Sequence, residues 1–347
     1  MKFYQLAVKT NNGRMIFAST GKPTFPVNKD LARTARAFWK RKSAIDYDQV
    51  EGNVEAKKIM ANGLTKWYGV NISPQDVIFT VGGLSALKII KDSLIGNNAI
   101  ATPVPYYPYY KNFNLTSFEN NPKGFLFCDP DNPTGQLINW QKYFKYIGRN
   151  PFPIIIDESY SELCFYQKHQ SLFSQVPFLR KKMVIIRSAT KVFSASGERL
   201  GAIICQNPEW REKLIDGIAN SYVHPPLSGQ MAYAVAMNKF TEDKRKRITD
   251  YYLQRVNYGM QRLQKMNINL QGNIDAGLYV LADLSRLGKT DEDICKMLLL
   301  EEQLAIAPMS FFGEDPNKGH VRITCTEDFP VLKDLFDRIE GRLKHVV

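Results

Sequence analysis

A serine, a lysine and an arginine follow one short apolar run in this chain of 347 residues. The run covers residues 183–186, and the three polar residues are Ser188, Lys191 and Arg199. An amine that reacts with an aldehyde needs a lowered pKa, and burial at a strand end beside another cation lowers it. The stretch therefore predicts a nucleophilic Lys191, although a lysine on a solvated loop would show the same local sequence.

Two glycines form a possible binding site for phosphate. Gly82 and Gly83, followed by Leu84, come between an apolar run and a helical pattern. Backbone N–H groups at the start of a helix are free to bind an anion. Glycines also occur at such turns for steric reasons alone, so this motif is compatible with simple packing.

An aromatic run and an amide follow two further apolar runs. Tyr107 lies in the aromatic run of residues 103–110, which suits stacking on a flat heterocycle or a corner of the core. Asn132 precedes a proline, which keeps it extended with its amide free to donate. The Asn-Pro-Thr-Gly motif is also an ordinary turn.

An acid ends another apolar run. Asp157 follows three isoleucines, and Tyr160 lies three residues further on. A carboxylate at this place is costly to bury unless it pairs with a cation or a protonated ring nitrogen. The alternative for an isolated acid of this kind is a cap on the next helix.

These residues follow short apolar runs that alternate with helical patterns, which is typical of βαβ units and a mostly parallel sheet. Ligands of such sheets bind at the carboxyl ends of the strands, where the polar residues lie. The expected strands cover residues 76–80, 99–102, 124–128, 153–157, 183–187 and 201–205.

Helical patterns surround this region. We expect an N-terminal arm and part of a small domain over residues 1–42, a large domain over 43–240 and a small α+β domain over 241–347. A long charged helix from residue 241 to about 263 would bridge the lobes. The other expected helices cover residues 30–39, 54–67, 210–219, 227–237, 292–300 and 331–343, and the strands of the small lobe cover 277–282 and 321–324.

Composition excludes several classes of protein. The net charge of +12 comes from short, scattered basic clusters without a recognisable nucleic-acid module, so solvated helix faces explain it. Five widely spaced cysteines suggest buried thiols in a reducing cytoplasm, and four scattered histidines suggest no metal site. No apolar run predicts a signal peptide or a membrane span.

In order and spacing the motifs resemble the pyridoxal-phosphate-dependent aminotransferases of fold type I, class I/II, from about Gly21 to Arg322. The resemblance implies a mostly parallel, seven-stranded-type sheet between helices, a smaller α+β lobe, and pyridoxal 5'-phosphate as cofactor. Lys191 resembles the lysine that forms the Schiff base. Asp157 resembles the acid that keeps the pyridine nitrogen protonated.

The resemblance assigns further contacts to the cofactor. Tyr160 and Asn132 resemble the pair that hydrogen-bonds the ring hydroxyl, and Tyr107 resembles the aromatic residue that stacks on the ring. The phosphate would be bound by the amides and side chains of Gly82, Gly83, Leu84, Ser188 and Arg199.

Substrate and subunit contacts follow from the same resemblance. Arg322 matches the arginine that binds the substrate α-carboxylate, for which a planar bidentate group is suited, with Gly21 and Asn132 beside it. Tyr47 resembles the tyrosine that reaches the cofactor phosphate of a neighbouring subunit. The resemblance therefore implies a homodimer with shared active sites.

The expected reaction transfers an amino group between an L-α-amino acid and a 2-oxo acid, with Lys191 moving the proton. The run from Asp157 to Leu163 is similar to histidinol-phosphate aminotransferases, but residues 305–313 lack an arginine for a substrate phosphate. A substrate with an α-carboxylate is therefore favoured. The motifs do not identify its side chain, which depends on loops.

Three alternatives remain at this point. A C–S lyase or a decarboxylase could use the same residues, although Arg322 argues weakly against decarboxylation. A non-enzymatic binding or regulatory protein could keep the fold. The presence of both Lys191 and Asp157, and the lack of an N-terminal DNA-binding extension, argue against this class.

Overall fold

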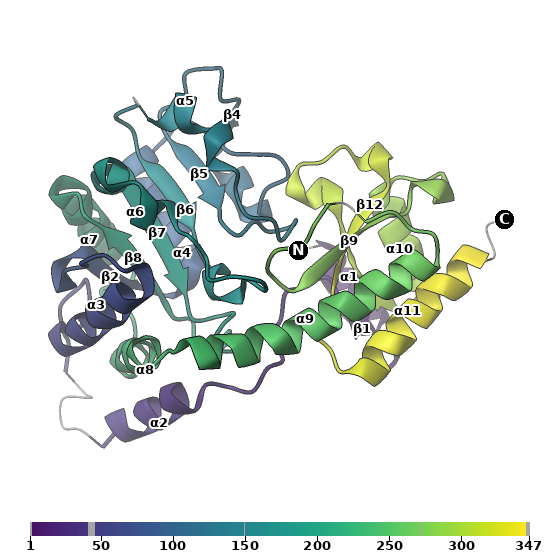
Figure 1. The fold of residues 1–347 in the computed structure, drawn as a ribbon, viewed down its shortest axis with the longest axis horizontal. Coiled ribbons are helices and arrows are strands. Elements are labelled where there is room, and N and C mark those ends of the chain that lie inside the picture. Colours follow the sequence, from purple (N-terminus) through teal and green to yellow (C-terminus); the bar gives the residue numbers. More distant parts are fainter. Residues whose placement is uncertain (1, 41–45, 149, 271, 345–347) are drawn as a thin grey trace.

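The computed structural model describes residues 2–40, 46–148, 150–270 and 272–344. Figure 1 shows a large lobe and a smaller lobe, with the long helix α9 (Glu242–Lys265) running from one to the other. Thr241 caps this helix by accepting a hydrogen bond from the Lys244 N–H. The predicted bridging helix is confirmed.

A seven-stranded sheet forms the centre of the large lobe in the described chain, in the order β2-β8-β7-β6-β5-β3-β4. Only β8 runs antiparallel to its two neighbours, so the predicted mostly parallel sheet is confirmed. The strands are β2 (Val77–Thr80), β3 (Ala99–Ala101), β4 (Asn114–Thr116), β5 (Phe125–Cys128), β6 (Ile154–Asp157), β7 (Met183–Ser188) and β8 (Gly201–Cys205).

The edge strand β4 was not predicted. Its sequence, Asn-Leu-Thr, holds one apolar residue, and it pairs only with β3. An edge strand has one open side and needs no continuous apolar run. The central strands β5, β6 and β7 are buried along their whole lengths, which explains why their sequences were recognisable.

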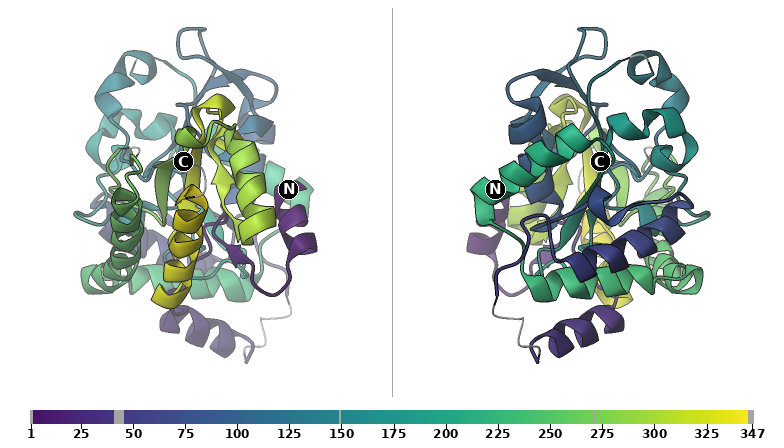
Figure 2. Two further views of the ribbon diagram at one scale, coloured as in Figure 1. Left: turned by 90° about the vertical axis from the view of Figure 1, so that its right-hand side faces the viewer. Right: turned by 90° about the vertical axis from the view of Figure 1, so that its left-hand side faces the viewer.

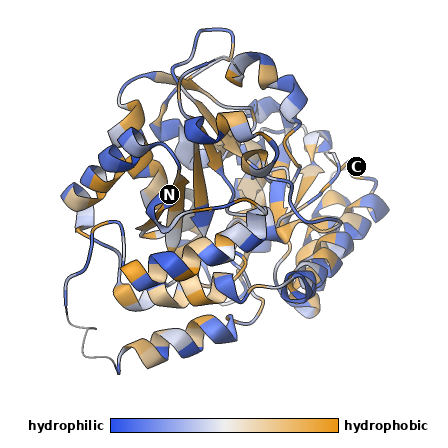
Figure 3. Cartoon of the chain, turned by 60° about the vertical axis from the view of Figure 1, so that its left-hand side comes forward, coloured by the Kyte–Doolittle hydropathy of each residue, from blue (hydrophilic) through white to orange (hydrophobic). Residues whose placement is uncertain are grey.

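Helices cover the sheet on both faces, as the two side views in Figure 2 show. Helix α4 packs against β7 and β8, and α3 packs against α8. Figure 3 shows hydrophobic strands inside and hydrophilic residues on the outer helix faces. The helices of this lobe are α2 (Lys29–Phe38), α3 (Val54–Tyr68), α4 (Gly82–Ile90), α5 (Phe144–Ile147), α6 (Leu172–Gln175), α7 (Pro208–Tyr222) and α8 (Leu227–Asn238).

The small lobe contains a three-stranded antiparallel sheet in the order β11-β12-β9, together with two helices predicted from sequence. Its N-terminal strand β1 pairs in parallel with β10. The elements are β1 (Ile16–Phe17), β9 (Tyr279–Asp283), β10 (Leu304–Ala305), β11 (Ala307–Pro308), β12 (His320–Thr324), α10 (Asp291–Glu302) and α11 (Phe329–Lys344).

Helix α1 (Lys2–Thr10), which the sequence did not predict, lies within the N-terminal arm expected over residues 1–42. Ala7 is fully buried in a small cluster with Leu299 and Ala305 of the small lobe. This helix therefore depends on contacts with residues about 300 positions away, which its own short sequence does not reveal. Among the described helices, none combines the length and apolar character needed to span a membrane.

Candidate active site

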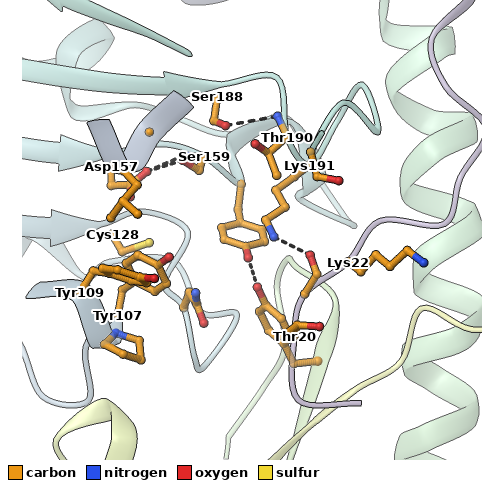
Figure 4. Close-up of a pocket in the computed structure, with 18 of the residues that line it drawn as sticks. Thr20, Lys22, Tyr107, Tyr109, Cys128, Asp157, Ser159, Ser188, Thr190 and Lys191 are labelled. Carbon is orange, nitrogen blue, oxygen red and sulfur yellow. Dashed lines mark hydrogen bonds between the residues drawn. The ribbon is translucent and has the colours of Figure 1, made fainter. Parts of the chain in front are cut away.

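One cavity of about 560 Å³ lies at the carboxyl ends of β5, β6 and β7 and is lined from both lobes (Figure 4). Nearly all the predicted site residues line it. They are Gly21, Gly83, Leu84, Tyr107, Asn132, Asp157, Tyr160, Ser188, Lys191, Arg199 and Arg322. The sheet topology brings them together because parallel strands end at one edge.

Lys191 follows β7, and its amine lies inside this cavity, where it donates a hydrogen bond to the Gly21 carbonyl (Figure 4). Burial, together with the positive charges of Arg322 and Arg199, lowers the pKa of this amine to about 8. Asp157 opposes the change. Sequence reasoning named Arg199 as the neighbouring cation, but Arg322, from the other lobe, has the larger effect on the pKa.

This pKa predicts how the cofactor-free protein reacts with aldehydes. Only the neutral amine attacks, so the rate of pyridoxal phosphate capture by Lys191 should rise about tenfold per pH unit below pH 8 and level off above it. Borohydride trapping followed by mass spectrometry measures the labelled fraction. Nα-acetyl-lysine is the control, and its rate should still be rising above pH 9. A Lys191 rate that also rises steeply above pH 9 would contradict the prediction.

Asp157 ends β6 as a buried carboxylate that forms no ion pair among the described residues. Ser159 orients it, since both its N–H (3.0 Å) and its hydroxyl (2.5 Å) donate to Asp157 Oδ1. Burial raises the pKa of Asp157, whereas the Ser159 bonds and the Lys191 charge lower it. A protonated ring nitrogen would provide the missing cationic partner.

The start of α4 and the loop after β7 can bind phosphate together. Gly82 has φ +77°, and a Cβ at this position would lie 2.8 Å from Arg199 Nη2, so glycine permits this close approach. No side chain caps α4, which leaves its first N–H groups available to a ligand. Buried Ser188 lies beside the cavity and accepts a hydrogen bond from the Thr190 N–H at 3.2 Å.

Arg322 extends from β12 into the cavity and is buried. Its Nη1 donates to Asn132 Oδ1 and its Nη2 to the Ser19 carbonyl, both at 2.6 Å. The guanidinium lies over the rings of Tyr279 (4.2 Å) and Phe312 (4.6 Å). These contacts fix the Arg322 guanidinium in a position where it can bind a carboxylate. They leave the amide nitrogen of Asn132 available to another ligand.

The two predicted cofactor tyrosines take different positions. Tyr160 is buried, forms a hydrogen bond with Tyr279, and has the Lys191 amine 5.5 Å from its ring centroid. Tyr107 lines the cavity, with its ring edge-on to Tyr110 at 5.7 Å. Burial raises the pKa of Tyr107 and that of Tyr279, the hydrogen-bond partner of Tyr160. The phenols of Tyr107 and Tyr279 therefore stay protonated.

Tyr47 lies outside the cavity of its own chain. Its side chain is 88% exposed, and its ring is edge-on to His224 with centroids 6.0 Å apart. The role of Tyr47 at a neighbouring subunit's cofactor stays a prediction.

Gly82 is the other predicted site residue that does not line the cavity. It lies next to the Arg199 side chain.

Two residues that contact the site were not singled out from the sequence. Ser159 lies inside the Asp157–Tyr160 motif, and its position two residues after an acid at a strand end was an available signal. Tyr279 lies in β9 within an ordinary apolar strand pattern, so no local signal could identify it. The described side chains include no group of three or more that could hold a metal ion.

The cavity fits pyridoxal phosphate. Its buried, unpaired Asp157 suits the ring nitrogen, its Lys191 amine suits the aldehyde, and the free start of α4 suits the phosphate. These three groups come from different elements and face one space. The residues present are therefore those that this cofactor needs.

Comparisons with known proteins agree with this assignment. The family model described as aminotransferase class I and II matches residues 114–339. The putative aminotransferase YugH of Bacillus subtilis (strain 168) is 22% identical, covering 98% of this chain and 94% of the relative. The aspartate aminotransferase of Thermotoga maritima is 24% identical, covering 95% and 91%. A solved aromatic aminotransferase from Pyrococcus horikoshii OT3 shares the fold, with a TM-score of 0.86 at 19% identity, covering 99% of this chain and 100% of that one.

Proposed function

Because this chain belongs to the class I and II aminotransferases, which use pyridoxal phosphate, we propose that Lys191, Asp157 and Arg322 carry its transamination chemistry. The substrates are an L-α-amino acid and a 2-oxo acid. The observation that supports these roles most is the amine of Lys191, with its pKa lowered to about 8, in one cavity with the unpaired carboxylate of Asp157.

When bound, the cofactor supplies a ring that draws electrons away from the substrate α-carbon. The Lys191 amine would hold the cofactor covalently, and as a free amine it would act as the base and acid that moves the proton at the substrate α-carbon. An amine with a pKa near 8 suits both steps, because it accepts and releases a proton near neutral pH. Asp157 would stabilise a proton on the ring nitrogen of the cofactor through its negative charge.

The other predicted residues bind and orient. Gly82, Gly83 and Leu84 would hold the phosphate through their N–H groups, together with Ser188 and Arg199. Tyr107 would stack on the ring, and Tyr160 and Asn132 would bind its hydroxyl. Arg322 would bind the α-carboxylate, with Gly21 beside it. The enclosed position of these groups favours charged hydrogen bonds.

We also propose that the active enzyme is a cytoplasmic homodimer in which Tyr47 reaches the partner's cofactor phosphate. The high exposure of Tyr47 supports this role, since the residue is free to contact a second chain.

The cysteines support the proposed cytoplasmic location, because five buried free cysteines fit a reducing compartment. We propose a division into residues 1–42 as the N-terminal arm and part of the small domain, 43–240 as the cofactor-binding domain and 241–347 as the small domain. The pairing of β1 with β10 supports this division for the first part of the arm, whereas α2 packs against α8 of the large lobe. We expect no nucleic-acid or membrane partner.

A panel of amino acids tests the reaction. Amino donors should convert the bound cofactor to its aminated form, and 2-oxoglutarate or pyruvate should reverse the change in absorbance. The relatives reported above are aminotransferases, so the C–S lyase and decarboxylase alternatives are not favoured. Release of ammonia or carbon dioxide without the aminated cofactor would contradict transamination.

Replacing Arg322 with lysine should lower kcat/KM by about 10- to 100-fold, mainly through KM. Lysine keeps the charge but loses the planar pair of donors, and a hydrogen bond to a charged group contributes about 1.5–3 kcal/mol. Steady-state kinetics with a good amino donor measures the change. Arg286→Lys, on the exposed surface of the same lobe, is the control and should leave KM unchanged. An unchanged KM in Arg322→Lys would contradict the proposed carboxylate site.

A further inference from the structure

Two buried phenols meet where the lobes join. Tyr160 follows β6 of the large lobe, Tyr279 lies in β9 of the small lobe, and their hydroxyl groups are hydrogen-bonded. Both side chains are almost fully buried, at 4% and 2% exposure, and their rings meet edge-on with centroids 5.8 Å apart. A hydroxyl pair in such surroundings has no water to replace a lost partner.

Charged groups enclose this pair. The Arg322 guanidinium lies 4.2 Å from the Tyr279 ring, and the Lys191 amine lies 5.5 Å from the Tyr160 ring. A Cβ on Gly21 would lie 3.0 Å from the Tyr279 hydroxyl, so the backbone of the N-terminal arm packs directly against the tyrosine pair. Tyr279 therefore occupies the space between the substrate arginine and the tyrosine expected at the cofactor.

We propose that Tyr279 is a positioning residue that donates its hydroxyl proton to Tyr160, leaving the proton of Tyr160 for the ring oxygen of the cofactor. This rests on the proposed function, which places Tyr160 at that oxygen. Each phenol has one proton, so only this direction of the bond lets Tyr160 both accept from Tyr279 and donate to the cofactor. A donor that itself accepts a hydrogen bond donates more strongly.

The contact has a consequence for the nitrogen of Lys191. When this nitrogen is bound to the cofactor, its proton is stabilised by negative charge on the nearby ring oxygen. A strong hydrogen bond from Tyr160 withdraws part of that charge and makes the proton easier to lose. Removing the Tyr279 hydroxyl should weaken this hydrogen bond and raise the pKa of the bound nitrogen.

The test is a pH titration of the visible absorbance of the cofactor-loaded protein. In Tyr279→Phe the midpoint should move upward by about half a pH unit, as expected for part of one hydrogen bond. Tyr110→Phe is the matched control, since Tyr110 is equally buried near the site but forms no hydrogen bond with Tyr160 among the described residues. Its midpoint should equal that of the wild type.

A double-mutant cycle provides a second measurement. Tyr160→Phe removes the same contact from the other side, so Tyr279→Phe should cause no further shift in that background. An unchanged midpoint in Tyr279→Phe, or an equal shift in the Tyr160→Phe background, would overturn the inference. If Tyr279→Phe does not fold, a Tyr160→Phe midpoint equal to that of the wild type would overturn it. A wild-type protein without a visible cofactor band would instead contradict the proposed function.

Discussion

Replacing Lys191 with alanine is expected to lower kcat/KM for transamination by about 10⁴-fold or more. The variant loses the covalent link to the cofactor and the group that moves the proton, and proton transfer alone contributes about 10²- to 10⁴-fold. The purified variant should still bind pyridoxal phosphate noncovalently, because the phosphate and ring contacts remain. Steady-state rates and the visible spectrum of the bound cofactor measure both effects.

A second buried lysine provides the control for this variant. Lys57 is buried outside the cavity and forms an ion pair with Glu51 at 3.2 Å. Lys57→Ala should lower stability but leave kcat/KM within a few-fold of the wild type. If Lys191→Ala kept more than a tenth of the wild-type kcat/KM, the proposed role of Lys191 would be wrong.

Replacing Asp157 with asparagine is expected to reduce kcat by about 10²- to 10³-fold. Asparagine has nearly the same shape, and its oxygen can still accept the two hydrogen bonds from Ser159, so the change removes charge and little else. Loss of one partner from a buried ion pair costs about 3–5 kcal/mol. Single-turnover kinetics with a saturating amino donor isolates this loss from substrate binding.

Asp76 is the matched acid for this experiment. It is buried at the start of the sheet and pairs with Arg211 at 3.1 Å, away from the cavity. Asp76→Asn should destabilise the protein without changing the single-turnover rate. Equal rates for Asp157→Asn and the wild type would show that Asp157 does not maintain the ring charge.

The sequence predicts the central strands and the site residues that follow them because the two signals, an apolar run and the polar residue after it, are local. A run such as residues 154–156 is buried on both faces, and the polar residue after it must lie at the sheet edge, which identified Asp157 and Lys191. The edge strand β4 lacks such a signal because it contains one apolar residue, and helix α1 lacks it because its partners Leu299 and Ala305 are distant in the sequence.

Two contacts between the lobes were not predicted from the motifs. The larger effect of Arg322 on the pKa of Lys191, and the bond between Tyr279 and Tyr160, join residues more than 110 positions apart. Such pairs depend on how the lobes pack, and neither member carries a pattern that points to the other. Tyr47 shows the same limit, since its predicted role depends on a second chain.

The pairing of the N-terminal segment with the small lobe has a consequence for synthesis on the ribosome. Ile16 is in register with Leu304, and Ala18 donates a hydrogen bond to the Ala305 carbonyl and accepts one from the Thr324 N–H. A growing polypeptide must therefore be synthesised beyond residue 324 before residues 16–18 can find all of these partners. Loop closure over such a length is entropically costly, so we expect the N-terminus to dock late, after the large lobe has already folded.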